Sequence, residues 1–239
     1  MFTRCSVLIV RPYPAALRTA NQLFSSGFFE PFILPLSRIK PMHAAVLSKE
    51  QYDAVLATSA NAFLQPLFCF HRLLTLPLYC VGQRTAQAAY KHHFTSIIIV
   101  AKNVDELCIE IGKRKKRHKH FIYLAGRKRR PVLENFCKKL GVRIDSLEVY
   151  DTEILAPSSI QKKGFPKTID FVLLYSSANL ACFLEACTNF VMLETKILCL
   201  SPRIAKSVSH AFGCQQLFSA DEPTEKALFS LLDLSRKRS

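Results

Sequence analysis

The sequence is poor in glycine and lacks the familiar catalytic motifs. It has only seven glycines among 239 residues and neither a GxGxxG nor a Walker loop, so nothing indicates a nucleotide cradle. GxSxG and HExxH are also missing. No histidine shows metal-ligand spacing, a statement that covers His43, His71, His92, His93, His118, His120 and His210. We therefore expect no cofactor and no metal, and a site that works by positioning and electrostatics.

Long apolar runs are missing as well. No stretch approaches the roughly 18 to 20 apolar residues that span a bilayer, and the opening MFTRCSVLIVRP has no small-residue cleavage site. No CxxC pair occurs among the nine cysteines, which lie mostly in apolar segments: Cys5, Cys69, Cys80, Cys108, Cys137, Cys182, Cys187, Cys199 and Cys214. An odd number without pairing predicts reduced, buried thiols in a cytoplasmic protein.

Acidic residues are few, and the net charge is +15. Such a charge favours polyanions, but it does not choose among nucleic acid, an anionic membrane and a polycarboxylate ligand. The densest basic run, GKRKKRHKH (Gly112 to His120), follows a predicted helix, where cations are favoured. Few aromatic residues lie within it to stack on bases. We therefore interpret it as a solvated loop and expect neither nucleic acid nor a membrane as partner.

What the chain does contain is one unit copied twice. The segment from Val7 to Gly27 recurs 114 positions later. The matching pairs are 7–27 with 121–141, 52–61 with 169–179, and 78–86 with 197–205. A weaker match between the two copies aligns Glu106 with Glu225. A duplicated chain usually builds two similar lobes, and the cleft between lobes is a natural ligand site.

Short apolar runs rich in β-branched residues alternate with segments of helical period, one of them expected as a helix from about Asn61 to Leu74. This pattern predicts an α/β protein of two similar doubly wound parallel-sheet lobes. Two extended segments interrupt the alternation and predict a two-stranded linker at about 34–42 and 146–156. Lobe one would then hold residues 1–36 and 156–239, and lobe two residues 39–152.

The repeated motifs follow predicted strands, where open α/β sheets bind ligands. ATSAN supplies Thr58, Ser59 and Asn61, which could cap a helix or donate to a ligand carboxylate. VGQRTA supplies Gly82 at a tight turn and Thr85 at a helix start. The second copy has Ser201 and Ile204 at the positions that match Gly82 and Thr85, so its ability to hold an anion is weaker.

Cations gather before one predicted helix. In AGRKRRP, Arg127 and the three basic residues after it crowd a helix N-terminus, whose dipole disfavours them unless an anion or water relieves the repulsion. Arg11 holds the equivalent position in the other copy.

An ordered set of motifs resembles a known family. It comprises VRP (10–12), TSAN (58–61), VGxxTA (81–86), LAG (124–126), GVRIDSLEVYDT (141–152), SSAN (176–179) and LSPRIA (200–205). The set is similar to that of uroporphyrinogen-III synthase, and it extends over essentially the whole chain. The resemblance implies two α/β lobes on a two-stranded linker and, like the motif analysis, no cofactor or metal.

The resemblance also implies an activity. Its substrate would be hydroxymethylbilane, with eight carboxylates, received in a transient handover from porphobilinogen deaminase. The enzyme would remove the terminal hydroxyl, invert ring D through a spiro intermediate and close the macrocycle as uroporphyrinogen III. Tyr150 and Thr85 match the family's catalytic candidates, while Ser176 and Ser177 are expected to bind substrate in the second copy. We expect a monomer.

One alternative stays open on the sequence alone. The substitutions Ser201 and Ile204 in the second turn also fit a non-catalytic, basic, two-lobed module that binds a tetrapyrrole or another polyanion. The presence of both Thr85 and Tyr150 favours the enzyme.

Overall fold

The computed structural model describes residues 4–42, 50–64, 67–156, 165–177, 180–187, 194–212 and 216–237. The chain forms two compact units. Unit 1 contains residues 1–38 and 153–239, and unit 2 contains residues 39–152. Within the described ranges, no helix is both long and apolar enough to cross a membrane.

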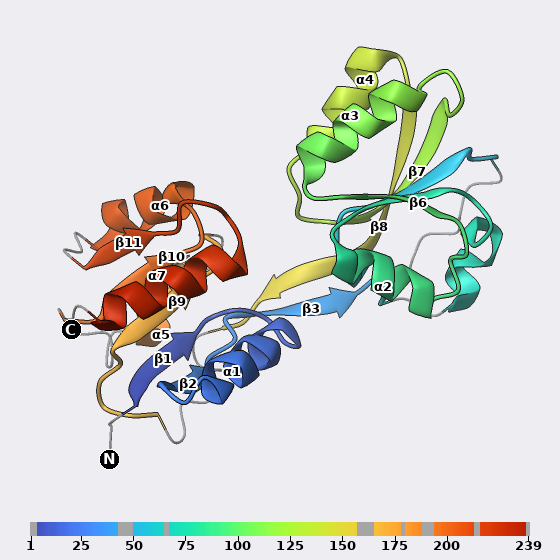
Figure 1. Cartoon of the computed structure of the whole chain (residues 1–239). Helices are drawn as coiled ribbons and strands as arrows, with labels where there is room; N and C mark the ends of the chain where they lie inside the picture. Colours follow the sequence, from blue (N-terminus) through green and yellow to red (C-terminus); the bar gives the residue numbers. More distant parts are fainter. Residues whose placement is uncertain are drawn as a thin grey trace. The chain divides into compact units, whose positions relative to one another are not determined.

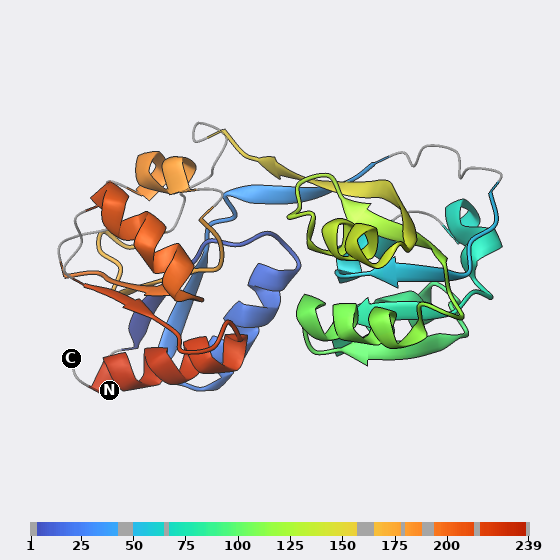
Figure 2. The same ribbon diagram turned by 90° about the horizontal axis from the view of Figure 1, so that it is seen from above.

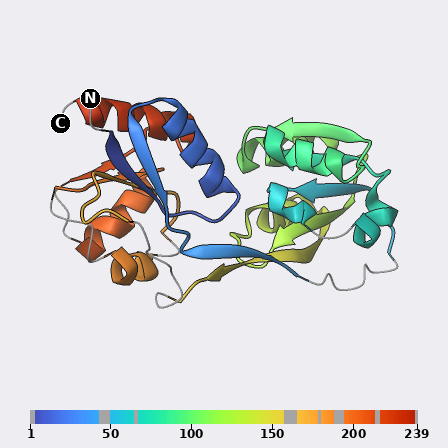
Figure 3. The same ribbon diagram turned by 90° about the horizontal axis from the view of Figure 1, so that it is seen from below.

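Unit 1 is a five-stranded parallel sheet covered by helices on both faces (Figures 1, 2 and 3). Its strand order is β11-β10-β9-β1-β2. The strands are β1 (Cys5–Ile9), β2 (Phe29–Ile33), β9 (Phe171–Leu174), β10 (Lys196–Cys199) and β11 (Leu217–Ser219). Helices α1 (Ala15–Ser25) and α7 (Glu225–Lys237) cover one face. Helices α5 (Leu180–Cys187) and α6 (Pro202–Phe212) cover the other.

Unit 2 repeats this design with one additional edge strand. Its order is β3-β8-β7-β4-β5-β6. The strands are β3 (Ser37–Pro41), β4 (Ala54–Ala57), β5 (Leu78–Val81), β6 (Ile97–Ala101), β7 (His120–Gly126) and β8 (Arg143–Ile154). Helix α2 (Gln83–Lys91) and the 3-10 segments η1 (Ala60–Phe63) and η2 (Leu67–Leu73) lie on one face. Helices α3 (Val104–Arg114) and α4 (Val132–Leu140) lie on the other.

The two sheets match strand for strand, with β1, β2, β9, β10 and β11 corresponding to β7, β8, β4, β5 and β6. Val7 pairs with Phe171 in one sheet, as Phe121 pairs with Ala54 in the other. The glycines that end the two matching helices, Gly27 and Gly141, both have positive φ, which other residues adopt only with strain. The repeat in the sequence is therefore a repeat of structure.

The chain passes between the units along β3 and β8, which are neighbours in the sheet (Figure 1). The Met42 N–H donates to the Val149 carbonyl, and the Leu155 N–H donates to the Leu36 carbonyl. Residue numbers rise on one strand as they fall on the other, so the two strands run in opposite directions. These are the two segments whose sequence interrupts the strand and helix alternation.

The helix expected from about Asn61 to Leu74 is wrong. The structure has two 3-10 segments there, η1 and η2, separated by residues 65–66, which lie outside the described residues. Pro66 explains the error, because proline has no N–H to donate and disfavours helical geometry at the residue before it.

The structure describes six cysteine side chains, and all six are free thiols. The expected burial is confirmed for five of them, whereas Cys5 is half-buried. Burial raises the pKa of Cys199 to about 12. The side chains of Cys69, Cys187 and Cys214 lie outside the described residues.

An aspartate at the same place in each copy joins the two central strands at their amino ends. The Asp53 carboxylate accepts the N–H groups of Lys119 at 2.7 Å and His120 at 2.9 Å. The Asp170 carboxylate accepts the N–H of Ser6 at 2.7 Å and its hydroxyl at 2.8 Å. The backbone hydrogen bond from Lys119 lowers the pKa of Asp53.

We expect Asp53→Ala and Asp170→Ala each to lower the free energy of unfolding by about 1 kcal/mol, because two donors lose a charged acceptor at a solvated site. Urea titration followed by circular dichroism measures this. Since the pKa of Asp53 is lowered on folding, its contribution is present above about pH 4 and is lost as the pH falls further. Asp221→Ala, in an exposed bend, is the control. Equal stability of all three variants would contradict this role.

Candidate functional site

In open parallel sheets, ligands bind at the carboxyl ends of the strands where the strand order reverses. In unit 2 this point lies between β4 and β7, since the chain proceeds from β4 to β5 on one side and from β7 to β8 on the other. Thr58 and Ser59 follow β4, Gly82 follows β5, Arg127 follows β7, and Tyr150 lies in β8. The structure therefore places these predicted residues at neighbouring strand ends of one sheet.

The residues after β4 serve both as cap and as hydroxyl donors. Ser59 precedes η1, and its hydroxyl accepts the Asn61 N–H at 3.2 Å, so the capping interpretation holds for Ser59. The Thr58 hydroxyl lies 2.7 Å from the hydroxyl of Tyr123 on β7. No sequence motif indicates Tyr123, because this residue lies within an apolar strand and its pattern is that of a core residue.

Tyr150 lies directly against Gly126, the last residue of β7. A Cβ built on Gly126 would lie 2.6 Å from the Tyr150 Cζ and 2.9 Å from its hydroxyl oxygen. The glycine of the LAG motif is therefore required for space, because any side chain would occupy the volume of the tyrosine ring.

A bulge in β8 orients Tyr150. Ala125 pairs with Glu148 and Gly126 pairs with Tyr150, which leaves Val149 as an extra residue. Side chains normally alternate between the faces of a sheet, but Val149 and Tyr150 both pack into the cluster on the α2 face. In a regular strand, the side chains of Val149 and Tyr150 would point to opposite faces of the sheet.

The two tyrosines remain neutral at physiological pH. Burial raises the pKa of Tyr150, although a hydrogen bond with Ser59 and the charge of Arg129 lower it. Burial likewise raises the pKa of Tyr123, against the effect of its hydrogen bond with Thr58. Each phenol can therefore donate a hydrogen bond.

Carboxylates of the chain itself relieve the repulsion among the cations that precede α4. The Arg129 guanidinium contacts Glu134 at 2.7 Å and Glu148 at 3.3 Å. Arg127 contacts Glu148 at 3.2 Å and Asp151 at 3.7 Å, and its side chain is 54% exposed. Arg127 is therefore the more accessible of the two cations, at the surface beside Tyr150.

Gly82 and Thr85 shape the turn after β5. Gly82 has φ of 80°, and its carbonyl accepts the N–H groups of Thr85 and Ala86. This geometry leaves the first N–H groups of α2 without a partner inside the helix. Thr85 itself is only 3% exposed, so its hydroxyl is largely covered.

In unit 1, the carbonyl of Ser201 accepts the N–H groups of Ile204 and Ala205. The turn therefore has the same hydrogen bonds as at Gly82, with buried Ile204 in place of Thr85. Ser176 and Ser177 follow β9, and the Ser177 carbonyl accepts the Leu180 N–H.

Arg11 follows β1 next to the serines of β9, at the switch point of unit 1. Its Nη1 contacts the Glu225 carboxylate at 2.8 Å and the Thr19 hydroxyl at 3.3 Å. Its guanidinium lies over the Tyr175 ring, 3.9 Å from the centroid. Arg11 is therefore paired within its own unit, a contact that motif analysis did not anticipate.

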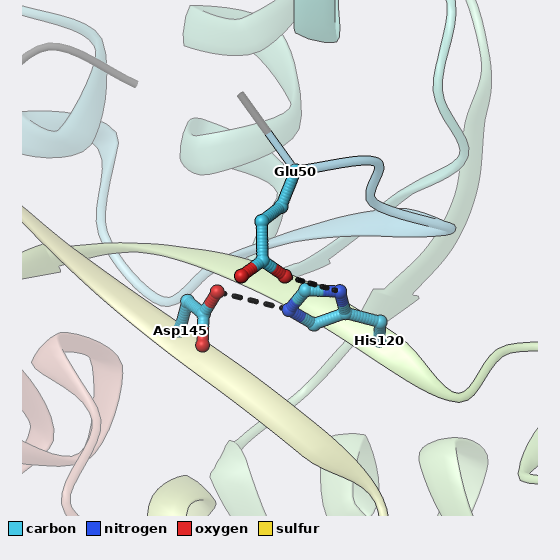
Figure 4. A group of neighbouring side chains, drawn as sticks. All are labelled: Glu50, His120 and Asp145. Carbon is cyan, nitrogen blue, oxygen red and sulfur yellow. Dashed lines mark hydrogen bonds and ion pairs between the residues drawn. The ribbon is translucent and has the colours of Figure 1, made fainter. Parts of the chain in front are cut away.

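Among the described residues, only Glu50, His120 and Asp145 group like metal ligands (Figure 4). His120 lies at the start of β7, at the opposite end of the sheet from Tyr150. Arg143 contacts Glu50 at 2.7 Å and Asp145 at 3.5 Å. Because this guanidinium contacts both carboxylates, the group is explained as an ion-pair network.

The two units, each a parallel sheet with hydroxyl and cationic side chains at its switch point, define a two-lobed α/β protein. Residues 18–230 match the family described as "Uroporphyrinogen-III synthase HemD". The chain belongs to this family, of tetrapyrrole biosynthesis.

Solved structures agree with this fold. Uroporphyrinogen-III synthetase from Helicobacter pylori is 18% identical, with a TM-score of 0.60, and the match covers 97% of this chain and 100% of that one. A mutant uroporphyrinogen III synthase from Thermus thermophilus is 13% identical, with a TM-score of 0.51 and coverage of 98% and 100%. Comparison with curated proteins found no match. The expected α/β class with two parallel-sheet lobes is confirmed.

We expect Gly126→Ala to lower the free energy of unfolding by about 1–3 kcal/mol, because its Cβ would overlap the Tyr150 ring. Gly112→Ala, where the nearest atom lies at 3.8 Å, is the matched control and should gain up to about 1 kcal/mol of helix propensity. Urea unfolding of Gly126→Ala, Tyr150→Ala and the double variant gives the coupling. Additive effects would contradict the contact.

A spectrophotometric pH titration tests the state of Tyr150. Because burial raises its pKa, its phenolate should form only above about pH 10. We expect Tyr150→Phe to remove absorbance from the late part of the titration, within the range where circular dichroism shows a folded chain. Tyr90→Phe, which replaces a 73% exposed tyrosine, controls for the loss of one phenol. If Tyr150→Phe instead removed absorbance from the early part of the titration, the result would contradict a buried Tyr150.

Proposed function

We propose that this protein is a uroporphyrinogen-III synthase, which cyclises hydroxymethylbilane with inversion of ring D and loss of water. Family membership supports this proposal. The main structural support is the position of Tyr150. This position depends on the bulge in β8 and on the absence of a side chain at Gly126. The bulge pairs Tyr150 with Gly126, and the missing side chain of this glycine leaves room for the tyrosine ring, so the hydroxyl is held in one place.

In this proposal the Tyr150 hydroxyl donates a hydrogen bond to the terminal hydroxyl of the substrate. As the C–O bond breaks, the leaving oxygen gains negative charge, so a hydrogen bond to it strengthens toward the transition state. With its pKa raised, Tyr150 acts as a hydrogen-bond donor rather than as a strong acid. The departing hydroxyl takes up one proton from solvent and leaves as water, and ring closure releases one proton from the pyrrole carbon that forms the new bond, so no net proton is consumed.

Binding would rely on charge and on short polar donors. The net charge of +15 draws a ligand with eight carboxylates toward the protein. In unit 2 we assign binding to Thr58, Ser59, Asn61, Arg127 and the turn at Gly82. In unit 1 we assign it to Arg11, Ser176 and Ser177. Because Thr85 is almost fully buried, we propose that its hydroxyl contacts the substrate only in the bound state.

A coupled assay tests the activity. The protein is mixed with porphobilinogen and porphobilinogen deaminase, and the oxidised porphyrin isomers are separated by chromatography. Without a synthase the bilane closes spontaneously to the type I isomer, which is the internal control. Predominant type III product would support the enzyme, and type I product alone would favour the non-catalytic tetrapyrrole-binding module.

We expect Tyr150→Phe to lower kcat for the type III product by roughly tenfold, with little change in KM. This is the loss of about 1.4 kcal/mol, one hydrogen bond made chiefly in the transition state. Tyr52→Phe, a change of the same kind at the opposite end of the sheet beside His120, is the control. Full activity of Tyr150→Phe would remove Tyr150 from the mechanism.

A further inference from the structure

Three donors in unit 1 converge on one carboxylate oxygen. Glu225 Oε1 accepts hydrogen bonds from Arg11 Nη1 at 2.8 Å, from the Thr19 hydroxyl at 2.5 Å and from the Tyr175 hydroxyl at 3.3 Å. The donors come from the end of β1, from α1 and from the end of β9. Together they form a carboxylate site that a residue of the same chain fills.

The place of this site in the sheet is that of a ligand site. Tyr175 is the first residue after β9 and Arg11 the second after β1, the strands between which the order of unit 1 reverses. Open α/β sheets bind ligands at this point. Burial raises the pKa of Tyr175 to about 12, so its hydroxyl remains a donor. The Arg11 and Glu225 side chains are 19% and 21% exposed, so the ion pair is shielded but still accessible to solvent.

Glu225 differs from the three donors in its surroundings. It is the first residue of α7 and follows four exposed residues, 221–224. Thr19 is fully buried, and Arg11 stacks on Tyr175, so these donors are held in place. Removing Arg11 would leave a shielded carboxylate without its counter-charge, which is costly. Exchange of one carboxylate for another keeps all three hydrogen bonds.

We propose that Arg11, Thr19 and Tyr175 form a carboxylate-binding subsite that Glu225 occupies in the free protein, and that a carboxylate of the ligand displaces Glu225. The identity of that ligand rests on the proposed function, whereas the subsite itself does not. Occupation by Glu225 reduces the fraction of molecules ready to bind, and the apparent affinity falls by that fraction. A neutral ligand could not replace the charge of Glu225 opposite Arg11.

The subsite is tested without any tetrapyrrole. Thermal unfolding of Glu225→Ala is followed in sodium acetate and in sodium chloride of equal ionic strength. We expect acetate to raise the Tm of this variant by restoring the missing carboxylate, and to have no specific effect on the wild type or on Arg11→Ala/Glu225→Ala. The same Tm in both salts would overturn the subsite, whatever the protein catalyses.

Displacement is tested by kinetics in the coupled assay. We expect Glu225→Gln to lower KM for hydroxymethylbilane by roughly fivefold with kcat little changed, because the neutral amide competes less for Arg11. Glu225→Asp, with a carboxylate too short to reach all three donors, should lower KM as well and serves if the glutamine variant does not fold. Glu222→Gln, an exposed neighbour, controls for net charge.

A purely structural ion pair predicts lower stability with unchanged KM, and an unchanged or higher KM in both Glu225 variants would overturn displacement. If the wild type forms only the type I isomer, the proposed function fails while the acetate result still decides on the subsite.

Discussion

The parallel pairing of the two central strands in each unit is the constraint on which the rest of the structure depends. β1 beside β9, and β7 beside β4, align the carboxyl ends of strands that are far apart in the sequence. Asp170 and Asp53 hold the amino ends of these pairs through backbone N–H groups. Because parallel strands end at one edge, each pair brings two loops together and thereby creates the place for a site.

What distinguishes the two sites is how each copy uses that edge. In unit 2 the Arg127 side chain is 54% exposed, and Tyr150 lies against Gly126. In unit 1 the Arg11 side chain is only 19% exposed and is paired with Glu225. The duplication therefore preserved the sheet and let the side chains at its edge diverge, since the core constrains packing while strand ends are freer.

The cations at both sites already interact with carboxylates of their own unit. Arg129 contacts Glu134 and Glu148, and Arg11 contacts Glu225. The net charge of +15 therefore gives the electrostatic field far from the surface. It does not describe the surroundings of each individual arginine. An anionic ligand is attracted by the field of the whole chain, but at each arginine it must compete with a carboxylate that is already bound.

The sequence by itself determined the α/β class, the repeat and the segments that lie at strand ends, because apolar period and turn residues are local properties. It misjudged residues 61–74, where Pro66 interrupts an apolar run. The two glutamates that the repeat aligns, Glu106 in α3 and Glu225 in α7, have different partners, since Glu106 accepts the Lys102 N–H whereas Glu225 accepts a hydrogen bond from Arg11. Only the tertiary structure decided the bulge at Val149, the contact of Tyr150 with Gly126 and the pairing of Arg11 with Glu225, 214 residues away. Such contacts depend on strand register and helix placement, which a local pattern does not encode.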